Sequence, residues 1–269
     1  MRTDNQYTFG DSDRAAERLY WLARTFDAGT LAFARAAVAR APAQASASAA
    51  EPLCCCVDLG AGPGFLTRTL HAGLQPTRTV GLEASARFVS FGSADLPSGI
   101  ELLEHDVLQP LPIRGDLMVS RFLLTHLHNP QLALTGWLSS VRAPCLLLLE
   151  ELAHMSSDLP ALQQYYELVA LVQRTAGQDM TIGLKLADLA QQAGWKVERH
   201  TVDRQQMPLA TMGRLHALNL PTLRQQKVVT DTYSTSTLDA LQSEIEQLAR
   251  GAVDGFVRVD MARCEALAL

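Results

Sequence analysis

The sequence predicts an α/β protein with a doubly wound sheet, and three observations support this fold class. Short apolar runs of the kind found in buried parallel strands recur along the chain, the first at residues 54–57. Stretches with helical spacing separate these runs, and the first run passes into a helix through a glycine-rich loop. The length of 269 residues, of which 48% are hydrophobic, suits one large domain better than two separate cores.

The loop after the first strand reads VDLGAGPGF and spans residues 57–65. Its glycines allow the backbone to turn tightly and to approach a ligand, because no Cβ stands in the way. A dinucleotide fingerprint, G-x-G-x-x-G, needs a third glycine where this chain has Phe65, so the spacing argues against a nicotinamide-dependent oxidoreductase. The loop alone leaves two interpretations, a nucleotide-binding loop and an ordinary tight turn between strand and helix.

An acidic residue followed by Gly-x-Gly-x-Gly after the first strand resembles the first motif of the class I S-adenosylmethionine-dependent methyltransferases. The resemblance implies a Rossmann-like, doubly wound sheet of seven strands, most of them parallel. It implies S-adenosylmethionine as the cofactor, with S-adenosylhomocysteine as the product. It also places Asp58, Gly60, Gly62 and Gly64 at the cofactor.

Two later strand ends also match the pattern of this family. Residues 79–83 form a short strand ending in Glu83, and a carboxylate at the carboxyl edge of such a sheet can accept hydrogen bonds from both hydroxyls of a ribose. This acidic residue matches the family's second motif. After the strand at residues 100–104, the resemblance places Asp106 against the exocyclic amine of adenine. The predicted adenosine site also includes Ala84 and Val107.

The remaining strands complete the predicted sheet. Residues 116–127 look like the family's fourth motif, a strand that runs into a loop under the methionine end of the cofactor. The predicted contacts at this end are Ser120, Arg121, Tyr7 and Arg18. Strands five, six and seven are predicted at residues 145–151, 195–200 and 255–260.

Residues 1–40 are predicted to form an N-terminal helical cap. A first helix follows an N-cap at Asp11 or Ser12, and a second starts near residues 27–30. Residues 41–51, APAQASASAAE, have no periodic apolar face and are predicted as a flexible linker. The cap resembles the leading helix of microbial small-molecule methyltransferases of the secondary-metabolite type, where it covers the cofactor. Residues 52–269 are predicted as the Rossmann-like methyltransferase domain, with a helical insert after strand five and helical lid elements around 155–190 and 205–250.

Methyl transfer from a sulfonium needs little covalent chemistry from the protein and no metal ion. The methyl group is already activated, so the protein mainly aligns the acceptor and excludes water. A base helps only if the acceptor has a proton to lose. Residues near the carboxyl edge that can act as this base are His126, His128, Glu150, Glu151 and His154. The predicted catalytic residues are His154, His126 and Glu151, with surface or structural roles as the alternative.

The acceptor pocket is expected between the cap and the insert after strand five. An apolar chamber there suits a planar or lipophilic small molecule. Its predicted lining is Trp21, Phe26, Tyr165, Tyr166 and Met207, for each of which a place in the core is the alternative. The predicted function is therefore methyl transfer to an O-, N- or C-nucleophile of a small molecule. The alternative is a protein of the same fold that binds S-adenosylmethionine without methylating, as a rearrangement catalyst or a binding protein.

Charge and composition limit the classes of binding partner that the sequence is expected to have. The 23 Lys and Arg residues are outnumbered by 28 Asp and Glu residues, and the resulting formal charge of −5 disfavours a nucleic-acid partner. No run approaches the ~20 apolar residues of a membrane span, and the N-terminus lacks the apolar core of a signal peptide. Three of the five cysteines are consecutive, Cys54 to Cys56, and lack the C-x-x-C spacing that grips zinc. We expect a cytoplasmic monomer or homodimer.

Overall fold

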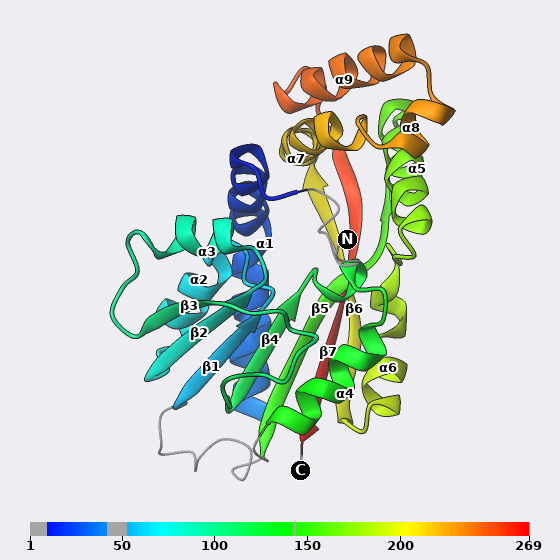
Figure 1. Ribbon diagram of the computed structural model, residues 1–269. Helices are drawn as coiled ribbons and strands as arrows, with labels where there is room; N and C mark the ends of the chain where they lie inside the picture. Colours follow the sequence, from blue (N-terminus) through cyan, green and yellow to red (C-terminus); the bar gives the residue numbers. More distant parts are fainter. Residues whose placement is uncertain (1–9, 42–52, 142–143, 269) are drawn as a thin grey trace.

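The computed structural model of the protein describes residues 10–41, 53–141 and 144–268, and shows one sheet with helices on both faces (Figure 1). The strand order in this part of the chain is β3-β2-β1-β4-β5-β7-β6. The strands are β1 (Cys55–Leu59), β2 (Arg78–Glu83), β3 (Ile100–Glu104), β4 (Leu117–Arg121), β5 (Cys145–Ser156), β6 (Lys196–Pro208) and β7 (Phe256–Ala268). The first five run parallel, and β7 runs antiparallel to both of its neighbours. The predicted seven-stranded, mostly parallel, doubly wound sheet is confirmed.

The helices begin where the sequence offers capping residues. Ser12, Ser85, Asn129 and Ser234 each accept a hydrogen bond from a first-turn backbone N–H, which satisfies one of the unpaired donors there. The helices are α1 (Asp13–Arg40), α2 (Phe65–Leu74), α3 (Ala86–Ser93), α4 (Pro130–Ser140), α5 (Pro160–Thr175), α6 (Leu186–Gln192), α7 (Leu209–Leu223), α8 (Lys227–Thr232) and α9 (Thr235–Ala249). No helix in the described residues has both the length and the apolar composition needed to cross a membrane.

The middle of β5 shows why helices are needed on both faces of the sheet. Its residues 145–150 are all buried, so successive side chains must pack on opposite sides. Leu146 and Leu148 pack in a core with α1 and α2, whereas Leu147 and Leu149 pack in a core with α4 and α6. The uninterrupted apolar run in the sequence is therefore the signature of a strand covered on both faces.

The N-terminal segment forms one helix where the sequence predicted two. α1 starts after Ser12, as predicted, and continues to Arg40 without a second start near residues 27–30. Its later half is part of the main core, because Phe33, Ala34 and Ala37 pack against β1, β4 and β5 together with α2. Most of the predicted linker, residues 42–51, lies outside the described residues.

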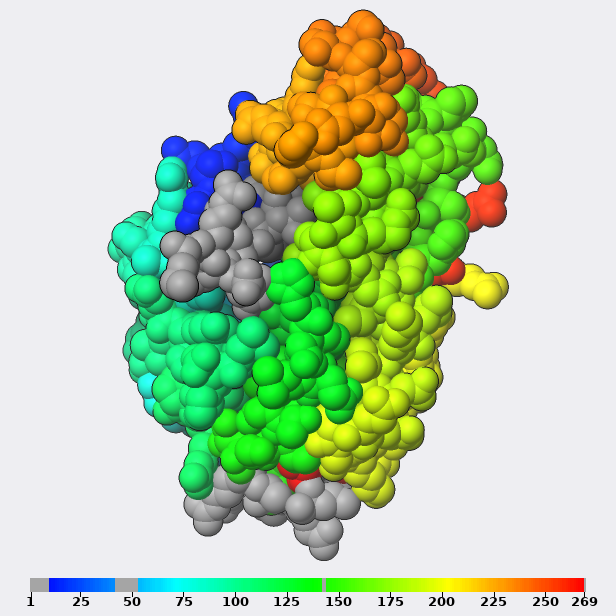
Figure 2. Space-filling view, turned by 45° about the vertical axis from the view of Figure 1, so that its right-hand side comes forward, coloured from blue at the N-terminus to red at the C-terminus, as the bar shows by residue number. Residues whose placement is uncertain are grey.

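Strands β5, β6 and β7 continue beyond the positions that the sequence predicted for them. Val257 and Val259 from β7 pack with α5, α7 and α9 in a separate apolar core, which we call the core of the helical lobe. The helical lobe comprises α5, α7, α8 and α9, and it stands above the carboxyl edge of the sheet (Figure 1; α8 and α9 are orange at the top of Figure 2). α6, which falls within the predicted lid around 155–190, instead packs with α4 against the sheet through Leu186 and Ala190.

Candidate functional site

A cavity of about 290 Å³ extends between the carboxyl edge of the sheet and the helical lobe. The glycine loop forms one part of its wall, α1 a second, and α5 and α7 a third. The predicted site residues that line it are Arg18, Phe26, Asp58, Gly60, Gly62, Glu83, Ala84, Asp106, Val107, Arg121, His126 and Tyr165. The fold thus brings together residues from six separate segments of the chain at the edge where open α/β sheets bind ligands.

The glycine loop needs glycine at three positions for backbone reasons. Gly60, Gly62 and Gly64 have φ angles of +71°, +54° and +75°, a region that residues with a Cβ rarely adopt. The N–H of Gly60 donates to the carbonyl of Leu82 on β2 at 2.9 Å, which ties the loop to the neighbouring strand. The loop is therefore held in a shape that brings bare backbone to the cavity wall.

Glu83 lies at the end of β2 with its carboxylate fixed by backbone donors. Its Oε2 accepts from the N–H of Gly62 at 2.8 Å, and its Oε1 accepts from the N–H of Ser85 at 2.8 Å. Burial nevertheless raises the pKa of Glu83 above its ordinary value. The carboxylate thus joins the glycine loop to the second strand and still lines the cavity.

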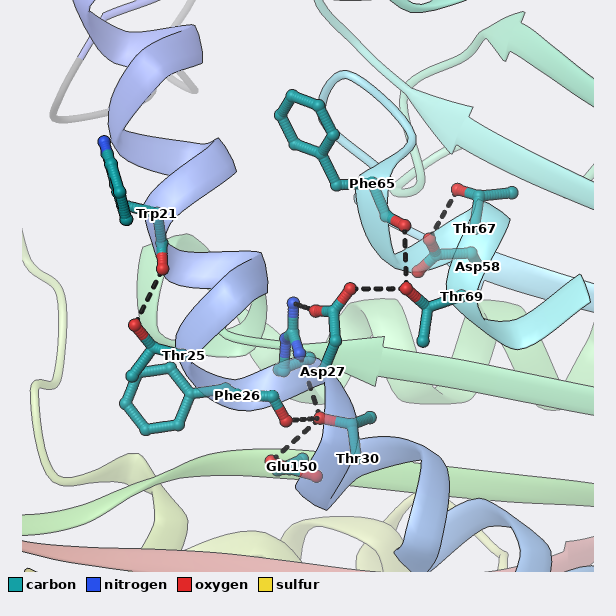
Figure 3. Close-up of polar contacts among 11 residues, drawn as sticks. Trp21, Thr25, Phe26, Asp27, Thr30, Asp58, Phe65, Thr67, Thr69 and Glu150 are labelled. Carbon is teal, nitrogen blue, oxygen red and sulfur yellow. Dashed lines mark hydrogen bonds and ion pairs between the residues drawn. The ribbon is translucent and has the colours of Figure 1, made fainter. Parts of the chain in front are cut away.

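Two aspartates complete this edge of the cavity. Asp106 accepts through Oδ1 from the N–H of Leu108 at 3.0 Å, which holds the turn after β3. Asp58, at the base of the loop, accepts from the hydroxyl of Thr67 at 2.7 Å (Figure 3). Burial raises the pKa of Asp58 to about 6. Asp58 thus has its partner within the protein, whereas Asp106 presents a partly exposed carboxylate at the cavity.

A polar network in the middle of α1 holds Arg121 at the cavity wall. The Arg121 guanidinium forms an ion pair with Asp27 at 2.7 Å and donates to the Thr30 hydroxyl at 2.9 Å. Asp27 also accepts from Thr69 of α2 at 2.7 Å, and Thr30 donates to Glu150 of β5 at 3.2 Å (Figure 3). These contacts fix α1 against α2, β4 and β5, directly beside the cavity.

Two predicted cofactor residues, Gly64 and Ser120, are not part of the cavity lining. Gly64 caps α2, and a Cβ added there would meet the side chain of Leu102 at 2.9 Å. Ser120 is fully buried within the sheet. Side chains alternate along a strand, so Ser120 faces the opposite way from Arg121, the residue that lines the cavity. Tyr7 lies outside the described residues.

Three of the five predicted substrate residues are also directed elsewhere. The ring of Trp21 lies 4.2 Å from the guanidinium carbon of Arg214, where it joins α1 to α7. Tyr166 follows Tyr165 on α5 but is not part of the cavity lining, and its hydroxyl lies 3.3 Å from Nε2 of His216. Met207 lies on β6 and packs beside the core of the helical lobe.

The three predicted catalytic residues lie in different parts of the structure. His126 lines the cavity, and burial of its ring beside Arg18 lowers its pKa to about 3. Glu151 lies outside the cavity lining, where its Oε1 accepts from the N–H of Leu124 at 2.6 Å, and burial raises its pKa to about 8. His154 is exposed on the later part of β5 and lines a second hollow with Tyr166. Glu151 therefore supports the loop after β4, and His154 lies outside the cavity lining, although Leu152 and Met155 beside it line both hollows.

Buried polar residues in the cavity wall that were not predicted as site residues include Thr125 and three residues of the helical lobe. Gln173 comes from α5, and His216 and Asn219 lie one turn apart on α7. His216 and Asn219 share the helix face of Met212 and Leu215, with spacings of three and four residues, which is the pattern of an inward-facing stripe. This periodicity is the sequence signal that could have identified both residues.

Comparison with solved structures identifies the fold of this chain. No family model and no curated protein matches the sequence. A solved candidate methyltransferase from Bacillus halodurans matches 82% of this chain and 94% of its own, with 13% identity and a TM-score of 0.55. The cyclopropane synthase MmaA2 from Mycobacterium tuberculosis matches 81% of this chain and 79% of its own, with 16% identity and a TM-score of 0.51. A candidate methyltransferase in complex with the Haloferax volcanii activator Trm112 matches 71% of this chain and 78% of its own, with 17% identity and a TM-score of 0.52. The chain has the Rossmann-like fold of the class I S-adenosylmethionine-dependent methyltransferases.

Proposed function

We propose that this protein transfers the methyl group of S-adenosylmethionine to a lipophilic small-molecule acceptor. The observation that carries the proposal is the continuity of the cavity. One end is built from the glycine loop, Glu83 and Asp106, and the other from apolar side chains of the helical lobe. A single chamber with a nucleotide-type end and an apolar end is suited to holding a cofactor against an apolar second substrate.

Features of the chain itself fit the adenosyl cofactor. The positive φ angles of Gly60 and Gly62 leave backbone where a Cβ would otherwise stand. Glu83 is fixed at the strand end, from which a carboxylate can accept from ribose hydroxyls, and Asp106 lies one strand further on, beside the expected adenine. Arg18 supplies a cation for the methionine carboxylate, with Arg121 held nearby by Asp27. Ala84 and Val107 would complete the adenosine wall.

The chain's part in the reaction is mainly alignment and exclusion of water. When bound, S-adenosylmethionine supplies an electrophilic methyl group. His126, with a pKa of about 3, is a weak base at neutral pH, and Glu151, with a pKa of about 8, is mostly protonated. Neither residue is suited to strong base catalysis, so the rate must come from holding the acceptor in line within an apolar chamber.

Isotope labelling tests this function directly. The purified protein is incubated with S-adenosylmethionine bearing a deuterated methyl group and a metabolite extract, and mass spectrometry follows the label. We expect a labelled product together with S-adenosylhomocysteine, and neither with the matched Gly62→Val variant. Binding of the cofactor without label transfer would favour the non-methylating alternative, and absence of binding would contradict both.

A further inference from the structure

The acceptor end of the cavity contains polar atoms that the protein leaves without partners. Gln173 Oε1, His216 Nδ1 and Asn219 Oδ1 are buried and have no hydrogen-bond partner in the structure. All three residues are more than nine-tenths buried and line the cavity. Leaving a buried polar atom unpaired costs about 1–3 kcal/mol, so three in one wall indicate a ligand that completes them.

Contacts within the helical lobe hold two of these residues in place. Asn219 donates through Nδ2 to the Tyr165 hydroxyl at 3.0 Å, which leaves its Oδ1 as an acceptor. The ring of His216 lies 4.2 Å from that of Tyr165, and its Nε2 lies 3.3 Å from the Tyr166 hydroxyl. The two tyrosines and α7 therefore present His216 and Asn219 in a fixed orientation, as a binding site requires.

The three residues themselves are uncharged, and the charge that acts on this wall is that of Arg18, which partly offsets the rise that burial causes in the pKa of Tyr165 and which the proposed function assigns to the methionine carboxylate. Burial lowers the pKa of His216 to about 3, so its ring is neutral at physiological pH. Gln173 and Asn219 are neutral amides. The surrounding lining is apolar and includes Phe26, Met212 and Leu215. With Arg18 paired with the methionine carboxylate, a charged acceptor group would lose its hydration here without gaining an opposite charge, which disfavours it.

Building on the proposed function, we propose that Gln173, His216 and Asn219 form the acceptor-recognition site, and that the acceptor is an uncharged, largely apolar molecule with hydroxyl or N–H groups. The two amide oxygens can only accept, so they select hydrogen-bond donors on the ligand. The neutral imidazole can donate or accept according to its tautomer. Carboxylates, phosphates and simple hydrocarbons fit this wall poorly.

Matched probes on two scaffolds test the proposal. Naphthalene-2,6-diol and biphenyl-4,4′-diol are compared with their dimethyl ethers, which keep the oxygens but lack donors, and with the corresponding monocarboxylates. Calorimetry is carried out with S-adenosylhomocysteine present. We expect at least one diol to bind about tenfold more tightly than its ether and its carboxylate, as the loss of one or two hydrogen bonds implies.

Variants then test which residues produce the preference for the diol. Asn219→Leu and His216→Phe should remove the preference for the diol, with unchanged affinity for S-adenosylhomocysteine as the sign that the fold is intact. Gln242→Leu is the matched control, because Gln242 in the helical lobe also has a buried unpartnered amide oxygen but does not line the cavity. Equal binding of diol and ether, tighter binding of the carboxylate, no binding of any probe, or a preference that survives both variants would overturn the proposal. Failure of S-adenosylhomocysteine to bind the unaltered protein would instead overturn the proposed function.

Discussion

Replacing Asp27 by Asn should lower the free energy of unfolding by about 3 kcal/mol. The Asp27 and Arg121 side chains are only 14% and 6% exposed and form an ion pair at 2.7 Å. Removing one partner of a buried pair costs about 3–5 kcal/mol, because the other charge is left without compensation. Asparagine keeps an acceptor for Thr69 and a dipole for Arg121, which places the expected loss at the lower end of that range.

Asp13→Asn is the matched control on the same helix. Asp13 pairs with Arg87 at 2.6 Å, but the Asp13 and Arg87 side chains are 90% and 54% exposed. Solvent screening makes such an exposed pair contribute far less than a buried one. Urea unfolding followed by circular dichroism measures both losses. An equal loss in the two variants would refute the reasoning.

A double-mutant cycle isolates the ion pair itself. In an Arg121→Met background, Asp27→Asn should lower the free energy of unfolding clearly less than it does in the unaltered protein. The reason is that no buried cation then remains to lose its partner. Additive losses would contradict a direct coupling between Asp27 and Arg121. Asp27→Asn should also weaken binding of S-adenosylhomocysteine in calorimetry, since Arg121 lines the cavity.

Three further predictions concern the cofactor end and the loop after β4. Gly62→Val should abolish S-adenosylhomocysteine binding in a folded protein, because valine strains a backbone at φ +54° and its Cβ would approach Leu19 at 3.3 Å; unchanged affinity in calorimetry would exclude a role for the loop. Glu83→Gln should weaken the cofactor by ~1.5 to 3 kcal/mol, and a change in thermal stability alone would indicate a structural role. Glu151 has a folded pKa of about 8, above its ordinary 4.5, so the stability it contributes is complete below about pH 4.5 and is lost as the pH rises towards 8. Glu151→Gln should therefore flatten the decline in unfolding free energy across this interval, and an unchanged pH profile would contradict the shift.

Local signals explain why the first half of the sheet could be predicted. The glycine loop, the short apolar strands and the carboxylates at their ends are each encoded within a few adjacent residues. β2 and β3 were predicted to within one residue of the observed bounds, at residues 79–83 and 100–104. Strand order at the carboxyl edge then brings Asp58, Glu83 and Asp106 to one cavity without further information.

The break predicted near residues 27–30 shows how tertiary contacts override a local signal. Asp27 and Thr30 are typical of a helix start, because their side chains compete for backbone hydrogen bonds. In the folded chain their side chains bind Arg121, Thr69 and Glu150, and Thr30 also donates to the carbonyl of Phe26 within the helix, so α1 continues unbroken. The structural role of Asp27 and Thr30 depends on β4 and β5, which lie beside them only in the folded chain.

The sequence by itself determined the parallel sheet and the residues at its carboxyl edge, because strands buried on both faces and positive-φ glycines leave a direct imprint on residue type. Only the tertiary structure determined which residues form the acceptor end of the cavity. β7 continues through residues 261–268, which adopt a strand because β5 and β6 pair with them on both sides. His216 and Asn219 differ from surface polar residues only because the helical lobe buries them against the cavity. Helical spacing can put both residues on the apolar face of α7, but which cavity that face lines depends on how the layers assemble.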